Sequence, residues 1–156
     1  MKLLVNAFDL WVFTRAEDEP TYLLLRTSQE KAGRFFGGTK FWQIPGAFVE
    51  DDDEFPSVLR KPLEELGLES SAIWAVEHVY PIFNRRFGDL QLIPVFAAEI
   101  GERSEPRLTW EHSEFGWFTA AECQERLTFR GLLEGLERTR ACVSEPDRPD
   151  EVFRLL

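Results

Sequence analysis

A 23-residue segment, GAFVEDDDEFPSVLRKPLEELGL (46–68), constrains the fold of this chain more than any other feature. It begins with a glycine, passes through five consecutive acidic residues, and ends in a helix-like stretch before Gly67. Glycine is common just after the end of a helix because it adopts the left-handed conformation without strain. We therefore expect a helix from about Pro56 to Leu66. Pro62 lies inside it and removes a backbone hydrogen bond, which predicts a kink or a shortened first turn.

Strands precede this segment in the prediction, and strands followed by helices come after it. Runs of apolar and aromatic residues predict strands at 2–15, 21–28, 41–46, 72–84, 89–100 and 114–119. Thr119 and Glu122 form a capping-box pattern, which predicts a helix to about Leu127. A last helix is expected over 128–142, and the glycine-containing segment 30–40 is predicted to be a loop. Mixed strands with helices on their faces indicate an α/β (α+β) fold.

Length and charge narrow the classes of protein. The 156 residues suit one domain over 1–156, with 144–156 as a C-terminal tail whose apolar end docks on the body or on a second subunit. No apolar run approaches the roughly 20 residues of a membrane span, and the N-terminus lacks signal-peptide features, so we expect a cytoplasmic protein without a membrane partner. The net charge of −10 disfavours nucleic acid as a partner.

The same 23 residues resemble the signature of the Nudix hydrolases, G-x5-E-x7-R-E-U-x-E-E-x-G-U, in which U is a bulky aliphatic residue. Six positions fit this pattern: Gly46, Arg60, Glu64, Glu65, Gly67 and Leu68. Asp52 falls at the first glutamate, with Asp53 or Glu54 as alternatives if the loop shifts by one or two residues. Lys61 and Pro62 depart from the signature, so the Nudix box is degenerate.

The flanking segments over roughly 2–142 also resemble this family, and most closely its bacterial members that act on dihydroneopterin triphosphate or related nucleoside triphosphates. The resemblance implies an α/β/α sandwich with a mixed sheet. It implies a pyrophosphohydrolase that cleaves a nucleoside or pterin triphosphate, or another nucleoside diphosphate derivative, with Mg²⁺ or Mn²⁺. A small-molecule polyphosphate is thus the expected partner, and a homodimer is common among such relatives.

The resemblance also assigns roles to single residues. Glu64, Glu65 and Asp52 are the expected metal ligands, and Glu65 is also expected to be catalytic. Arg60 is expected to brace the acidic loop by a salt bridge to Asp52. Glu111 is the expected distal acid, which binds metal or acts as general base, and Glu114 is the alternative.

Substrate contacts are expected from a second group of residues. Arg26 resembles a phosphate-binding arginine of the family, and Phe41 and Trp42 are expected to stack on a base or pterin ring. Lys61 stands where the signature has an acid, and two interpretations remain open. Its ammonium pairs with Glu64 and Glu65 and replaces part of the metal charge, or it extends into solvent. The alternative function is a catalytically impaired Nudix domain that binds a nucleotide-like ligand or a protein.

Overall fold

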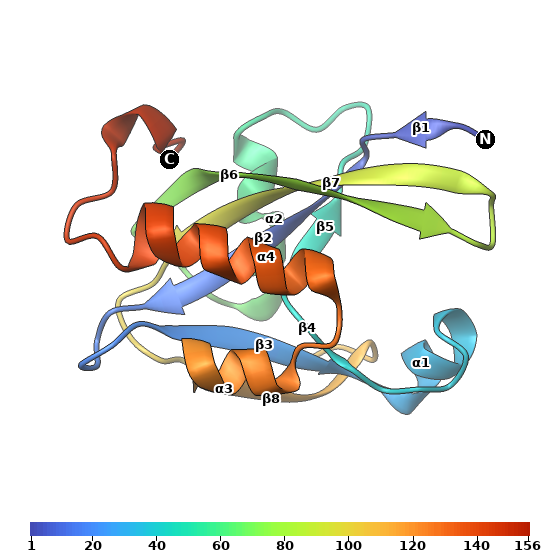
Figure 1. Ribbon diagram of the computed structural model, residues 1–156, viewed down its shortest axis with the longest axis horizontal. Coiled ribbons are helices and arrows are strands. Elements are labelled where there is room, and N and C mark those ends of the chain that lie inside the picture. The colour runs from blue at the N-terminus through green and yellow to red at the C-terminus, as the bar shows by residue number, and fades with distance from the viewer.

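Helices lie against both faces of one mixed sheet in the computed structural model, which describes residues 1–156 (Figure 1). The eight strands are β1 (Leu3–Leu4), β2 (Ala7–Thr14), β3 (Thr21–Thr27), β4 (Trp42–Gln43), β5 (Gly46–Phe48), β6 (Ala72–Asn84), β7 (Asp89–Glu99) and β8 (His112–Thr119). The α-helices are α1 (Gln29–Phe35), α2 (Lys61–Leu66), α3 (Ala120–Arg126) and α4 (Arg130–Thr139). The predicted fold class is confirmed.

Strand β2 is central, because it pairs with three other strands. It runs antiparallel to β3 and β5 and parallel to β7. Strand β7 also pairs with the antiparallel β6 and the short parallel β1, and β3 continues the sheet to β4 and β8. This pairing places β5, with the first residue of the 46–68 segment, directly beside β2.

Alternation of side chains along β2 divides the interior into two cores. Trp11 and Phe13 point into the core that α3 and α4 cover, and Leu10 and Val12 point into the core that α2 covers. Successive side chains of a strand point to opposite faces. A strand that is apolar on both faces therefore needs a helical layer on each side, and this gives the three-layer arrangement in Figure 1.

The predicted helix in the 46–68 segment forms in two parts. A 3₁₀ turn over Ser57–Arg60 leads into α2, so Pro62 falls in the first turn of the α-helix, where its missing N–H costs little. This confirms the shortened first turn. Gly67 has φ 70°, and its N–H donates to the Glu64 carbonyl, which confirms the predicted end of the helix.

Four predicted elements differ from the structure. The strand predicted over 41–46 is divided into β4 and β5, with no strand at 44–45. The N-terminal strand is interrupted between β1 and β2. The prediction of a loop over 30–40 was wrong for 30–35, because Ser28 caps α1 by accepting a hydrogen bond from the Lys31 amide at 3.0 Å. Residues 36–40 form a loop as predicted. The last helix begins two residues later than expected, its α-helical part ends at Thr139, and one π-helical turn over Arg140–Ser144 carries it past the predicted end at 142. Leu132 and Leu136 are buried on the side of α4 that faces the core.

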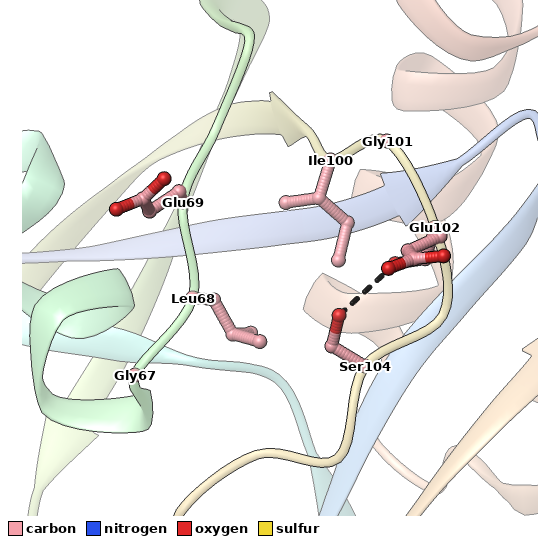
Figure 2. Close-up of a pocket in the computed structure, with 7 residues that line it drawn as sticks. All are labelled: Gly67, Leu68, Glu69, Ile100, Gly101, Glu102 and Ser104. Carbon is pink, nitrogen blue, oxygen red and sulfur yellow. Dashed lines mark hydrogen bonds between the residues drawn. The ribbon is translucent and has the colours of Figure 1, made fainter.

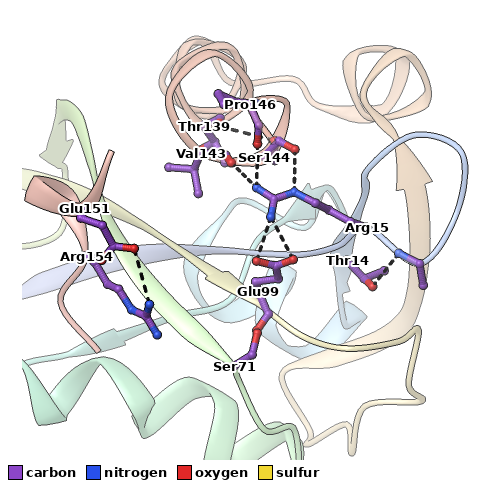
Figure 3. Close-up of polar contacts among 11 residues, drawn as sticks. Thr14, Arg15, Ser71, Glu99, Thr139, Val143, Ser144, Pro146, Glu151 and Arg154 are labelled. Atoms are coloured by element: carbon purple, nitrogen blue, oxygen red, sulfur yellow. Dashed lines mark hydrogen bonds and ion pairs between the residues drawn. The ribbon is translucent and has the colours of Figure 1, made fainter. Parts of the chain in front are cut away.

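The C-terminal segment docks on the body of the protein. Figure 3 shows the Arg15 guanidinium between Glu99, which it contacts at 3.0 Å, and the carbonyl oxygens of Val143, Ser144 and Pro146. Farther on, the amide of Leu155 donates to the carbonyl of Ile73 in β6 at 2.8 Å. These contacts hold the chain after α4 against the sheet. No helix has the length and apolar character needed to cross a membrane.

Candidate active site

Helix α2 presents two glutamates to solvent because its opposite side is anchored in the core. Leu59, Leu63 and Leu66 are buried in the core on this face of the sheet. Glu64 and Glu65 are exposed on the other side of the helix. Arg107 donates to the Glu64 carbonyl at 3.2 Å and so fixes the C-terminal end of α2.

The acidic loop folds back onto the start of α2 through one carboxylate. Oδ2 of Asp53 accepts a hydrogen bond from the Glu50 amide at 2.8 Å, and Nζ of Lys61 lies 3.4 Å from the same oxygen. The bond from the Glu50 amide and the nearby Lys61 ammonium lower the pKa of Asp53. Asp53 is therefore the acidic-loop residue that is tied to the helix.

A hollow of about 330 Å³ separates the loop from the helix. Its lining is mostly acidic and consists of Asp52, Asp53, Glu54, Ser57, Val58, Lys61 and Glu64. Carboxylate oxygens are the ligands that Mg²⁺ prefers. However, no three acidic, histidine or cysteine side chains come close enough together to share an ion, and the Lys61 ammonium lines the same hollow. In this arrangement the side chains do not fit a divalent cation.

The predicted metal ligands and the predicted brace are placed differently from expectation. Asp52 and Glu64 line the hollow, whereas Glu65 does not. Arg60 is exposed and forms no ion pair, so the expected bridge from Arg60 to Asp52 is absent. Lys61 and Asp53 make the connection instead. Of the two interpretations of Lys61, neither is met in full, since its ammonium contacts Asp53 rather than Glu64 and Glu65 or solvent alone.

Glu111 is held by α1. Its carboxylate lies 2.8 Å from Nζ of Lys31, and its carbonyl accepts a hydrogen bond from the Ser28 amide at 2.8 Å. The guanidinium of Arg34, one turn after Lys31, lies 5.1 Å from the ring centre of Trp110. Glu111 makes no hydrogen bond or ion pair with α2. The helix that the sequence did not predict thus fixes the predicted distal acid.

His112 is a neutral neighbour of this pair. Burial, together with the Lys31 charge, lowers its pKa to about 4. The Gln43 amide Nε2 lies 2.6 Å from Nε2 of the imidazole, and a neutral ring accepts this hydrogen bond. This contact ties β4 to the start of β8.

The candidate substrate-binding residues form two groups. Arg26 lies between Glu114, at 3.4 Å, and the ring of Trp42, whose centre is 6.0 Å from the guanidinium carbon. Phe41 belongs to an aromatic cluster, with ring centres 4.8 Å from Phe36 and 4.9 Å from Phe129 in edge-on contacts. Phe41 thus already packs against two aromatic rings, while Arg26 and Trp42 form a joint cationic and aromatic surface.

A second hollow, of about 480 Å³, lies beyond the C-terminal end of α2. Figure 2 shows Leu68 and Ile100 pointing into it and Glu69 pointing away. None of the predicted site residues lines it.

The sequence analysis did not identify Lys31, which pairs with Glu111, or Asp9, which lies beside Gly46. Lys31 fell in the supposed loop. Asp9 lies on β2 directly opposite Gly46, and its carboxylate accepts a hydrogen bond from the Tyr80 hydroxyl. A single aspartate in an otherwise apolar strand is the only signal that could have identified it.

A mixed sheet between helical layers, with an acidic loop leading into a short glutamate-bearing helix, defines a Nudix-type fold. A family model described as NUDIX domain matches residues 4–135. The chain belongs to this family, and the predicted membership of the Nudix family is confirmed. No curated protein matches the chain.

Solved structures agree with this assignment of the fold. A structure described as a NUDIX hydrolase of Listeria monocytogenes is 17% identical, with a TM-score of 0.76 over 94% of this chain and 99% of the other. An Ap4A hydrolase of C. elegans is 16% identical, with a TM-score of 0.69 over 92% and 100%. The NUDIX domain of Shewanella oneidensis NrtR, complexed with ADP ribose, is also 16% identical, with a TM-score of 0.69 over 90% and 89%.

Proposed function

We propose that this protein is a pyrophosphohydrolase that cleaves the phosphoanhydride bond of a nucleoside diphosphate derivative, with a nucleoside or pterin triphosphate as the preferred class. The main support is the position of Glu64, which lines the acidic hollow, and of Glu65, which follows it on α2 and is exposed. The proteins named above as an Ap4A hydrolase and an ADP-ribose complex share the fold and handle ligands with a phosphoanhydride bond.

Arg26 and Trp42 are the proposed substrate-binding surface. The planar guanidinium of arginine matches two phosphate oxygens, and an adjacent indole offers a face for a heterocyclic ring. Because Arg26 is only loosely paired with the exposed Glu114 at 3.4 Å, a phosphate can replace that partner at little cost.

Glu65 is the proposed general base. It is exposed and takes part in no ion pair, whereas Glu111 is engaged by Lys31. In the proposed reaction its carboxylate accepts a proton as water forms the new P–O bond and the bond to the leaving phosphate breaks. The family resemblance implies Mg²⁺ or Mn²⁺, but the side chains as arranged do not form a site for it. The assay below therefore measures whether hydrolysis requires a divalent cation.

The test is a hydrolysis assay with a matched variant. Purified protein is incubated with dGTP, dihydroneopterin triphosphate, Ap4A or ADP-ribose, each with Mg²⁺, Mn²⁺ or a chelator, and released phosphate and pyrophosphate are separated by ion chromatography. We expect turnover of at least one substrate and a loss of about 100-fold in kcat for Glu65→Gln. Glu125→Gln, an exposed glutamate on α3, is the control. Absence of turnover in every arm, or equal losses in both variants, rejects the proposal.

A binding module without catalysis is the second candidate. The observation that favours it is the ammonium of Lys61 in the hollow where the signature places an acid. Titration calorimetry with ADP-ribose in the presence of chelator distinguishes the two functions. Binding without turnover supports the module, and turnover supports the enzyme.

A further inference from the structure

Lys61 is the only basic residue in the lining of the acidic hollow, where it stands among four carboxylates. Its side chain is 35% exposed and that of Asp53 is 23% exposed, so this ion pair is partly shielded from water. The contact between Lys61 and Asp53 is therefore a feature of the folded loop.

The position of Lys61 in α2 explains which carboxylate it reaches. Lys61 is the first residue of the helix. Bonds from Cα to Cβ tilt toward the N-terminal end of a helix, so a side chain in the first turn lies over the chain that precedes the helix. Glu64 and Glu65 lie in the opposite direction along the chain. The Lys61 ammonium consequently lies over the acidic loop rather than beside the two glutamates.

The contact between Lys61 and Asp53 is one of three interactions that close the acidic loop. The Glu50 amide and the Lys61 ammonium both donate to Oδ2 of Asp53, while the Asp53 amide donates to the Glu50 carbonyl at 3.1 Å. Three interactions thus close the loop on itself and onto α2 without any other cation. A divalent ion that entered the hollow would meet a like charge 3.4 Å from one of its carboxylates.

We propose that Lys61 is a tethered counter-ion that closes the acidic loop onto α2 and competes with divalent cations for the hollow. This inference goes beyond the proposed hydrolysis and does not depend on it. At position 61 the signature has an acid. The lysine there closes the loop with its own charge and does not help to bind a metal ion.

The test measures metal binding directly, so failure of the hydrolysis proposal leaves it intact. Mn²⁺ titrations followed by electron paramagnetic resonance compare the wild type with Lys61→Met and Lys61→Glu. We expect about tenfold tighter Mn²⁺ binding for Lys61→Met, because a like charge is removed, and tighter binding still for Lys61→Glu, which adds a ligand. Lys40→Met makes the same change in net charge outside the hollow and is expected to bind Mn²⁺ like the wild type.

A second readout addresses closure of the loop. Amide hydrogen exchange at 50–54 is expected to be independent of Mn²⁺ in the wild type. In Lys61→Met it is expected to be several-fold faster without metal and to return toward the wild-type rate with Mn²⁺. Circular dichroism establishes that each variant is folded, and Lys61→Gln replaces any variant that is not. Unchanged Mn²⁺ affinity in Lys61→Met, or the same gain in Lys40→Met, would overturn the proposal.

Discussion

The hydroxyl of Tyr80 on β6 donates a hydrogen bond to the Asp9 carboxylate on β2, across the intervening strand β7. Burial raises the pKa of Asp9 to about 6, even though the bond from Tyr80 acts in the opposite direction. Burial and the adjacent carboxylate raise the pKa of Tyr80. A polar pair of this kind beside the first residue of the Nudix box makes the centre of the sheet sensitive to protonation.

Replacement of Asp9 by Asn isolates this sensitivity. A carboxyl group whose pKa is raised in the folded state stabilises the protein when protonated, and this contribution is lost as pH rises from about 4 through about 6. Asp9→Asn resembles the protonated form, so its stability relative to the wild type should increase over this range. The gain is up to about 3 kcal/mol at neutral pH. Urea unfolding at several pH values measures it.

The wild type must be compared with Asp9→Asn at each pH, because His112 changes the free energy of unfolding with pH in the opposite direction. Its pKa is lowered to about 4, so the wild type loses stability from this residue as pH falls below about 6.5. The His112 contribution is common to both proteins and cancels in their difference. A difference that does not change between pH 4 and pH 7 would contradict the assignment to Asp9.

Gly46→Ala should destabilise the protein by about 2 kcal/mol. A Cβ at this position would lie 2.5 Å from the Phe8 carbonyl oxygen and 3.0 Å from Oδ1 of Asp9, because β5 lies directly against β2 here. A backbone oxygen cannot move aside without distorting the sheet. Gly101→Ala, where a Cβ meets no atom within 4 Å, is the control. Equal unfolding midpoints for the two variants would show that the contact is not limiting.

The pair of Lys31 and Glu111 should show coupling in a double-mutant cycle. Lys31 is only 15% exposed and the ion pair is short, at 2.8 Å, although Glu111 is 43% exposed. We expect a coupling energy of about 1 kcal/mol for Lys31→Met and Glu111→Gln, measured by thermal unfolding. The exposed pair of Arg130 and Glu134 should give a smaller value, of about 0.3 kcal/mol. Zero coupling for Lys31 and Glu111 would mean that α1 is not held by this contact.

Arg15→Met should cost roughly 2 kcal/mol and loosen the chain after α4. Arg15 contacts Glu99 and three carbonyl oxygens at once, so its removal leaves a carboxylate and several acceptors without a donor (Figure 3). Arg15→Lys should recover only part of this, because an ammonium lacks the forked geometry. Amide exchange over 143–145 and urea unfolding provide the measurement. Unchanged exchange in this segment would contradict the role of Arg15.

Much of the fold was predictable because its signals are local. The end of α2 at Gly67 and the capping box of Thr119 and Glu122 depend on residues within one helical turn of each other. The apolar run of β2 likewise predicted a strand, although the structure interrupts the predicted strand between β1 and β2. In these cases the residues that determine the local structure are the same residues that adopt it, or their near neighbours in the chain.

Tertiary structure alone decided which charged groups meet. Lys31 and Glu111 are 80 residues apart in the chain, and their contact exists only after β3 and β8 have paired. The choice of Asp53 as the partner of Lys61, in place of Asp52 or Glu64, follows from the turn at Glu50 and from the direction of the first turn of α2. The sequence by itself determined that acids and a lysine would be neighbours, and three-dimensional geometry selected the pairs, because electrostatic contacts depend on distance in space rather than on position in the chain.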